Sequence, residues 1–129
     1  MKKTGFTLIE LMVVILIVGI LAAASVPLMR GRIDSAKWAE ANAMAGTIQT
    51  AARVYFVENG SVTQNKTALG FNSGDLTGTY FDESCFTVND DADTNGKVSV
   101  TVTGKNDGKS PDGTYILGKD GSWKKQAAE

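Results

Sequence analysis

The stretch FTLIELMVVILIVGILAAASV, residues 6–26, decides the fold of this chain. Its only ionisable side chain is Glu10, and its length is near the roughly 20 residues that a membrane-spanning helix needs. Lys2 and Lys3 precede the apolar run, and basic residues on that side predict a cytoplasmic N-terminus with the remainder of the chain outside. We therefore expect residues 6–29 to form a transmembrane helix.

Two interpretations of this run are open. In the first, Lys2 and Lys3 are the basic end of an ordinary secretory signal peptide, and Ala22-Ala23-Ala24 is its cleavage site. Signal peptidase would then release a secreted binding domain. In the second, the mature protein keeps the run. The second is favoured because the run exceeds the roughly 7–15 residues of a signal core. A disposable signal also has no use for Glu10, whose carboxylate is costly in an apolar phase.

Residues 2–10, KKTGFTLIE, resemble the processing signal of type IV prepilins and type II secretion pseudopilins. The resemblance implies that residues 1–5 are a leader peptide. It also implies that a membrane-bound prepilin peptidase cuts between Gly5 and Phe6, and that Phe6 becomes the methylated N-terminus. The glutamate expected at the fifth mature residue matches Glu10, and the proline expected near the outer edge of the apolar run matches Pro27.

Glu10 has a physical role that can be stated from its surroundings. A lone carboxylate in a bilayer or in an apolar filament core must be neutralised or paired. The freed amine of Phe6 on a neighbouring subunit could supply the partner. Such a pair would set the register of assembly, as a buried polar group does in a coiled coil. The alternative is a protonated Glu10 that is merely tolerated.

Helical periodicity continues beyond the apolar run. Apolar residues recur at spacings of three and four and predict an amphipathic helix over residues 35–58: Ala41, Met44, Ile48, Ala51 and Tyr55. Asn59-Gly60 is a helix stop signal. Gly19 and Pro27 are the predicted helix break. A simple kink and local unwinding on entry into a filament both remain open.

Residues 30–129 predict a globular head. A loop over residues 61–79, anchored by Leu69, Phe71 and Leu76, leads into a β-meander over residues 80–125. The expected strands are Tyr80–Val88, Lys97–Thr103, Thr114–Leu117 and Ser122–Lys124. The expected turns are Asn106-Asp107-Gly108 or Pro111-Asp112-Gly113, and then Lys119-Asp120-Gly121. The fold class is therefore α+β: a long N-terminal helix, transmembrane in its first half and amphipathic in its second, packed on a small antiparallel sheet.

Three oxygen-bearing side chains, Asp91, Asp93 and Asn95, precede Gly96 at alternate positions, as in the opening of a calcium loop. The complete twelve-residue loop would need a bidentate glutamate where Val102 stands. A partial calcium site and an ordinary acidic turn are both open. No other cofactor is expected.

The composition argues against catalysis and against nucleic-acid binding. The net charge is −1, from 13 basic and 14 acidic residues, so the strong positive balance of a nucleic-acid binder is absent. The sequence has no histidine and one cysteine, Cys85, which cannot form a disulfide within the chain. No phosphate loop and no paired nucleophile and base are found, so we expect no enzymatic activity.

The resemblance implies a structural subunit of a type IV pilus-like filament, a helical homopolymer serving adhesion, motility or DNA uptake. Its implied partners are other copies of the chain, the prepilin peptidase and the pilus assembly machinery of the inner membrane. It implies a place in the inner membrane before assembly, and afterwards in an extracellular pilus or a periplasmic pseudopilus. The alternative is the major pseudopilin of a type II secretion system. The sequence Asp-Pro-Trp-Gly, which resembles the calcium-binding region of such pseudopilins, does not occur here, and this favours the pilin.

Overall fold

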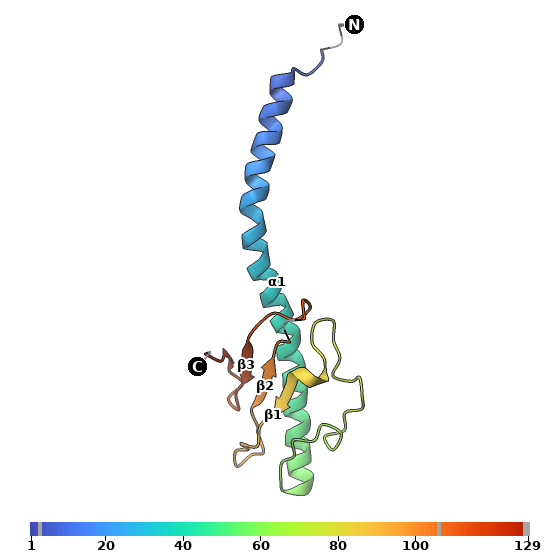
Figure 1. Cartoon of the computed structure of the whole chain (residues 1–129). Helices are drawn as coiled ribbons and strands as arrows, with labels where there is room; N and C mark the ends of the chain where they lie inside the picture. The colour runs from blue at the N-terminus through green and yellow to red at the C-terminus, as the bar shows by residue number, and fades with distance from the viewer. Residues whose placement is uncertain (3, 106, 128–129) are drawn as a thin grey trace. The chain divides into compact units, whose positions relative to one another are not determined.

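The computed structural model describes residues 1–2, 4–105 and 107–127, and its elements follow one another as shown in Figure 1. The elements are helix α1 (Leu8–Asn59), the 3-10 helix η1 (Glu83–Cys85), and strands β1 (Phe86–Val88), β2 (Val100–Thr103), β3 (Thr114–Leu117) and β4 (Trp123–Lys125). The chain divides into two compact units, residues 1–35 and the part that begins at residue 36. Lys3 of the expected leader, Asn106 of an expected turn and residues 128–129 of the expected head lie outside the described residues.

Helix α1 is a single α-helix of 52 residues that contains both Gly19 and Pro27. Over its whole described length the helix is not interrupted at either position, so the predicted break does not show as a change in secondary structure. Proline has no N–H to offer the carbonyl of Ala23, one turn earlier. Nearby, the Ser25 hydroxyl donates to the Leu21 carbonyl at 2.8 Å. The predicted helix over residues 35–58 is the second half of this same element.

The four strands form one antiparallel sheet whose spatial order, β1-β2-β3-β4, is also the order in the chain. Val88 lies opposite Val100, and Val102 lies opposite Tyr115. The β3–β4 turn closes where the sequence predicted it, because the Gly118 N–H donates to the Ser122 carbonyl at 2.8 Å. The α+β class and the antiparallel meander are confirmed.

The second half of α1 packs on this sheet through one narrow face (Figure 1). Its buried residues are spaced by three and four: Trp38, Ala41, Ala45, Ile48 and Ala52. The predicted stripe was right for Ala41 and Ile48, whereas Met44, Ala51 and Tyr55 are only half-buried. Alanines on the contact face let the helix backbone approach the sheet closely, and the prediction had favoured larger side chains.

Valines from the sheet region and aromatic residues complete the core. Val98, Val100 and Val102, at alternate positions of the segment that was predicted as a strand, are all fully buried. The Trp38 ring lies 5.1 Å from Phe81 and 4.3 Å from Tyr115, measured between ring centroids. From the loop over residues 61–79, Leu76 is buried while Leu69 and Phe71 pack against the cluster, as expected.

Two strands are shorter than predicted, because side chains take over backbone hydrogen bonds at their ends. Before β1, the Asp82 carboxylate accepts from the Ser84 N–H and caps η1, so only Phe86–Val88 remains extended within the predicted 80–88. Before β2, the Ser99 N–H donates to Asp91 at 2.8 Å instead of to a strand partner. The β2 strand therefore starts at Val100 rather than at Lys97. The β4 strand covers Trp123–Lys125, one residue later than expected.

Candidate functional site at the start of helix α1

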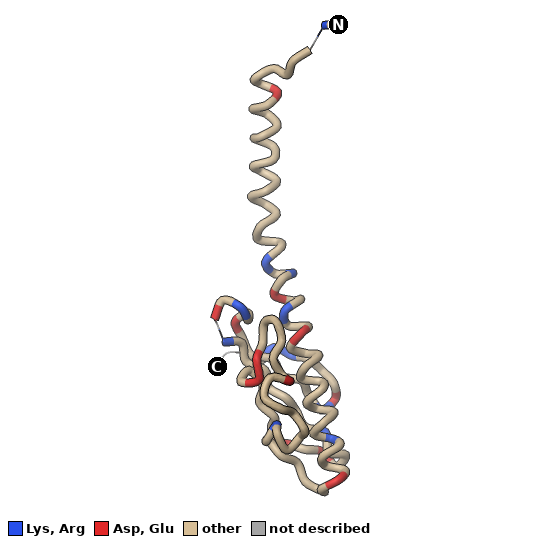
Figure 2. The backbone as a smooth tube through the Cα atoms, turned by 90° about the vertical axis from the view of Figure 1, so that its right-hand side faces the viewer, with Lys and Arg blue, Asp and Glu red and all other residues tan. Residues whose placement is uncertain are grey.

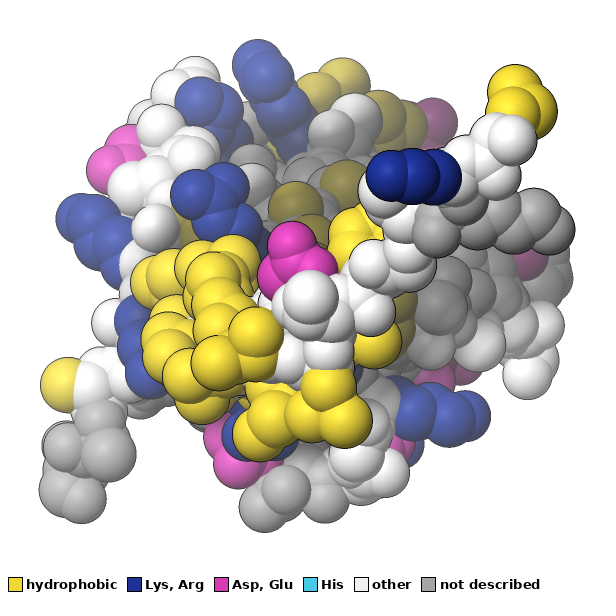
Figure 3. Space-filling model, turned by 90° about the horizontal axis from the view of Figure 1, so that it is seen from above, with side chains coloured by type: hydrophobic (Ala, Val, Ile, Leu, Met, Phe, Trp, Pro, Cys, Tyr) yellow, Lys and Arg dark blue, Asp and Glu magenta, His cyan; other side chains and the backbone are white. Residues whose placement is uncertain are grey.

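The first part of α1 exposes an apolar surface. Residues 4–36 are all exposed, and the large hydrophobic side chains among them include Phe6 at 84% and Leu8 at 75%. Figure 2 shows one acidic position near the start of the helix, followed by a long uncharged stretch. Figure 3, which views the chain from its N-terminal side, shows hydrophobic side chains gathered on this segment. By length and composition, α1 is the one helix of the described chain that could cross a membrane.

Glu10 and Thr7 form a reciprocal cap at the start of α1. One carboxylate oxygen of Glu10, Oε2, accepts from both the N–H and the hydroxyl of Thr7, each at 2.8 Å. In return, the Glu10 N–H donates to the Thr7 hydroxyl oxygen at 3.3 Å. This is the capping-box arrangement, in which residues at the cap and three positions later satisfy each other's free N–H groups. It explains why the helix begins at Leu8.

Only one of the two Glu10 oxygens is used in this cap. Oε1 makes no hydrogen bond and no ion pair with any residue that the structure describes. The side chain is exposed, so Oε1 is accessible to a cation from outside the chain. Glu10 therefore combines an internal partner, Thr7, with a free acceptor oxygen.

The predicted scissile bond, Gly5–Phe6, lies in exposed, non-helical backbone just before the cap. A Cβ atom added to Gly5 would meet nothing within 4 Å. The chain's own packing therefore does not require glycine here, and a requirement for glycine would have to come from a partner that handles this bond. The proximity of Gly5, Phe6 and Glu10 follows directly from the sequence.

Sequence reasoning missed the part that Thr7 plays. The signal was present: Thr7-Leu8-Ile9-Glu10 has the S/T-x-x-E spacing of a capping box directly before an apolar run. The prediction considered the cost of the Glu10 carboxylate in an apolar phase and did not consider Thr7 as its hydrogen-bond partner. The residues of the predicted break, Gly19 and Pro27, lie further along the same exposed helix.

The predicted calcium residues all lie in the β1–β2 connection, where carboxylate oxygens of Asp91 and Asp93 already have partners. Asp91 accepts from the N–H and the hydroxyl of Ser99, at 2.8 and 2.7 Å. Asp93 Oδ1 accepts from two backbone N–H groups, those of Asn95 and Lys97, at 2.9 and 2.8 Å. These hydrogen bonds lower the pKa of both carboxyls, although burial opposes the shift and is its largest single contribution at Asp91. Hydrogen bonds from backbone N–H groups to the side chains of Asp91 and Asp93 therefore hold the connection in place.

A lysine from outside this connection pairs with Asp91. The ammonium of Lys119 lies 3.6 Å from a carboxylate oxygen of Asp91 and donates to the Asp91 backbone carbonyl. Gly96 closes the turn with φ +73°, and a Cβ there would lie 2.3 Å from the Phe56 ring. Among the described residues no three His, Cys, Asp or Glu side chains gather as metal ligands do. Calcium binding by Asp91, Asp93 and Asn95 stays a prediction.

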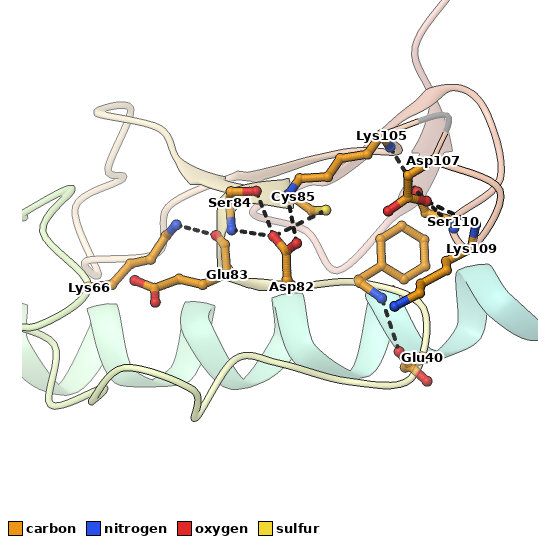
Figure 4. A network of polar contacts seen from close by, with 11 residues as sticks. Glu40, Lys66, Asp82, Glu83, Ser84, Cys85, Lys105, Asp107, Lys109 and Ser110 are labelled. Carbon is orange, nitrogen blue, oxygen red and sulfur yellow. Dashed lines mark hydrogen bonds and ion pairs between the residues drawn. The ribbon is translucent and has the colours of Figure 1, made fainter.

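A second polar network surrounds η1 (Figure 4). Asp82 pairs with Lys105 at 2.6 Å and accepts from the N–H and the hydroxyl of Ser84. Lys105 and the Ser84 groups hold the pKa of the Asp82 carboxyl well below its usual range. Cys85 is buried beside it, and burial raises the pKa of its thiol. Cys85 therefore acts as a small core residue.

Comparisons with known proteins agree with the geometry at the start of α1. Residues 1–26 match the family model described as the prokaryotic N-terminal methylation motif. The type IV major pilin protein PilE1 of Neisseria gonorrhoeae is 41% identical over 83 residues, which cover 63% of this chain and 50% of the relative. A type IV major pilin protein PilE from the same organism is 34% identical over 115 residues, covering 88% of this chain and 65% of the relative.

A relative from a secretion system is also found. The type II secretion system core protein G of Pseudomonas aeruginosa is 45% identical over 58 residues, which cover 45% of this chain and 41% of the relative. The chain spans about half the length of the relatives that it matches. It therefore carries the N-terminal methylation motif on a pilin-like α+β fold, and it is a homologue of type IV major pilins and of the type II secretion core protein G.

Proposed function

We propose that the chain is a structural subunit, not an enzyme, and that it polymerises through α1 into a type IV pilus-like filament. The observation that carries the proposal is the exposed apolar helix with Glu10 at its start, in a chain that matches the methylation motif. An exposed apolar surface of this extent needs a cover. Lipid supplies it in the inner membrane, and other copies of the chain supply it in the filament.

Processing prepares the start of α1 for assembly. A prepilin peptidase cuts between Gly5 and Phe6, and Phe6 is methylated on its new amine. The cut removes Lys2 and Lys3 and places an ammonium next to Thr7. The free oxygen of Glu10 then accepts a hydrogen bond from the Phe6 ammonium of a neighbouring copy, and this ion pair sets the register between subunits. The assembly machinery of the inner membrane moves the subunit from the bilayer into the filament.

We propose that the extracellular filament serves surface attachment, twitching motility or DNA uptake. The relative from the secretion system supports a second candidate, the major pseudopilin of a type II secretion system, with a periplasmic pseudopilus. Deletion of the gene separates the two. Loss of surface filaments with normal protein export supports the pilin, and loss of export with unchanged surface filaments supports the pseudopilin.

The proposal predicts different effects for the charge and the cap of Glu10. Glu10→Gln keeps a capping-box side chain but removes the charge, so the chain should still enter the membrane and should yield at least tenfold fewer filaments. Thr7→Val keeps the charge and removes the hydroxyl of the cap, at a cost of about 1 kcal/mol to the first helical turn. It should reduce assembly less. Filaments are measured in sheared fractions and by electron microscopy.

Glu58→Gln is the matched control, because it removes one exposed carboxylate from the other end of α1. It should assemble like the unaltered chain. Filaments of normal number and length from Glu10→Gln would rule out the register pair. The intact mass of the mature protein tests processing separately. A mature chain that begins after Ala24 would show that ordinary signal peptidase releases a secreted domain.

A further inference from the structure

A polar cavity of about 530 Å³, shallow and widely open to solvent, lies in the unit that begins at residue 36. Three segments that are distant in the sequence form its walls. The loop over residues 61–79 contributes Lys66, Ser73 and Thr77, the η1 region contributes Asp82 and Glu83, and the chain after β2 contributes Lys105. Figure 4 shows Lys66, Glu83, Asp82 and Lys105 along one side of this region. The volume is within the range of small-molecule sites in proteins, roughly 300–1,000 Å³.

Part of the cavity wall is fixed by hydrogen bonds. Lys105 donates to Asp82 at 2.6 Å, and Asp82 in turn holds the Ser84 N–H and hydroxyl. Lys66 reaches across from the loop and donates to the Glu83 carbonyl at 2.5 Å. These contacts join all three segments before any ligand arrives. A wall that is already ordered reduces the entropy that binding must overcome.

Other groups in the wall have unused hydrogen-bonding capacity. The Glu83 carboxylate and the hydroxyls of Ser73 and Thr77 make no hydrogen bond or ion pair with the residues that the structure describes. Each ammonium, on Lys66 and on Lys105, has three N–H donors and uses one of them on these partners. The cavity therefore offers acceptors, donors and dual-purpose hydroxyls side by side.

The chemistry of the wall specifies the class of ligand. Two lysines and two acids balance one another, so the cavity has no net attraction for an anion or a cation. A molecule with several neighbouring hydroxyls can donate to the Glu83 carboxylate and accept from an ammonium at the same time. We infer that this cavity binds a neutral, hydroxyl-rich ligand, a mono- or disaccharide unit.

A single site of this kind is weak, and a filament would make it useful. No aromatic residue lines the cavity, so a sugar ring has no stacking surface there, and we expect a Kd on the order of 1 mM. This step rests on the proposed function: identical sites repeated along a polymer convert weak binding into strong attachment to a saccharide-coated surface. The saccharide site itself exists on the single subunit.

The test uses the full chain in a detergent without a sugar headgroup, so that the detergent does not compete for the site. Glucose, galactose, N-acetylglucosamine and lactose are titrated while backbone amide NMR shifts are recorded. We expect at least one sugar to cause saturable shifts confined to residues 66–84 and Lys105. No saturable shift with any sugar up to about 100 mM, well above the expected Kd, would overturn the inference. So would saturation by the zwitterion glycine with none by sugars.

Two variants place the binding in the cavity. Thr77→Val removes an unused hydroxyl, and Glu83→Gln replaces an unused carboxylate by a neutral amide with one acceptor oxygen; each should weaken binding about tenfold, the effect of one lost or weakened hydrogen bond to ligand. Thr87→Val makes the same change as Thr77→Val on the exposed side of β1, outside the cavity, and should bind normally. Unchanged shifts elsewhere in the spectrum show that each variant is folded. Equal affinities in all three variants would overturn the inference.

Failure of this inference is distinguishable from failure of the proposed function. Glu10→Gln should bind the sugar as a single subunit even though it does not assemble. Conversely, Thr77→Val should form normal filaments that no longer attach to immobilised sugar. Filaments of Thr77→Val that attach like the unaltered ones would assign attachment to another surface and remove this site from that role.

Discussion

Asp82 is the residue on which the polar network around η1 depends. It caps η1 through Ser84 and holds the chain after β2 through Lys105. Both side chains of the ion pair are about 40% exposed, at 41% for Lys105 and 43% for Asp82, so solvent screens their attraction. Its contribution to the free energy of unfolding is therefore small compared with that of the buried core.

The stability that Asp82 provides should depend on pH in a definite direction. Lys105 and Ser84 lower the pKa of Asp82, so its contribution is complete above the unfolded value of about 3.9 and is lost as the pH falls further. At neutral pH, Asp82→Asn should lower the melting temperature by a few degrees, and the difference from the unaltered chain should shrink below about pH 4. Melting curves from neutral to acidic pH measure it.

Asp112→Asn is the control for this experiment, because it removes one carboxylate from an exposed turn without removing an ion pair. Its melting temperature should follow that of the unaltered chain at every pH. A difference for Asp82→Asn that stays constant down to the most acidic pH would contradict the assignment. The loss would then come from the altered cap of η1 rather than from the charge.

At the scale of elements, α1 stays helical across Gly19 although nothing in the chain requires glycine there. A Cβ at this position would meet nothing within 4 Å. Alanine favours a helix interior over glycine by about 1 kcal/mol. A glycine that costs helix stability without easing any contact within the subunit favours the second of the two alternatives left open by the sequence, local unwinding on entry into a filament, over a simple kink.

Gly19→Ala should therefore leave membrane insertion unchanged and reduce the filament yield severalfold, because it makes the helix harder to unwind. Gly46→Ala is the matched control: it lies in the same helix, and a Cβ there also meets nothing within 4 Å. Helix content of the purified subunit by circular dichroism and filament yield from sheared cells are the measurements. Normal filaments from Gly19→Ala would show that assembly does not use a weak point at this position.

Calcium binding by the β1–β2 connection can be tested through Lys119. Calcium bound to Asp91 would have to compete with the Lys119 ammonium. Lys119→Met should therefore show a larger rise in melting temperature between chelator and millimolar-range calcium than the unaltered chain. Asp93→Ala should abolish the rise. Lys124→Met, a change on the exposed strand β4, should respond like the unaltered chain. No rise in any variant would establish an ordinary acidic turn.

The sequence predicts elements well where the chain's pattern and its turns agree, as for β3, whose bounds Thr114–Leu117 are those expected. It predicts boundaries poorly where one side chain captures a backbone N–H. Asp91 takes the N–H of Ser99 and Asp82 takes that of Ser84, and both strands begin late. The alternation of apolar and polar residues along a strand cannot predict such a hydrogen bond, because the accepting carboxylate belongs to a residue outside the strand.

The candidate site also has parts that the sequence could predict and parts that it could not. Gly5, Phe6 and Glu10 are neighbours in sequence, so a local pattern was enough to single them out. The contact of Glu10 with Thr7 was also within reach of a local rule. The cavity around Glu83 could not have been predicted, because the loop over residues 61–79, the η1 region and Lys105 after β2 meet only through tertiary folding.

Across the whole molecule, the two units differ in how much apolar surface they expose to solvent. Residues 4–35 are exposed throughout and mostly apolar, whereas the unit from residue 36 buries a core of its own. In the proposed function the first unit always has a cover, either lipid or other copies. Cleavage after Gly5 then determines whether lipid or other copies of the chain cover this unit.

Gly5→Leu should leave an uncut precursor in the membrane, because the peptidase that the resemblance implies looks for glycine at this bond. The chain's own structure has room for the side chain, so misfolding would not explain the result. Intact mass of the membrane-bound protein measures the outcome. Gly31→Leu adds the same bulk where there is also room, and it should be cut normally. Mature Gly5→Leu protein beginning at Phe6 would contradict the assignment.

The order of the strands bears on how fast the second unit reaches its native state. Since β1, β2, β3 and β4 are neighbours in space in the same order as along the chain, each pairing closes only a short loop. Local connectivity of this kind speeds folding. A chain emerging on the far side of a membrane could add each strand to one already in position. Such vectorial folding would shorten the time during which Phe81, Phe86 and the core valines are open to aggregation or to proteases.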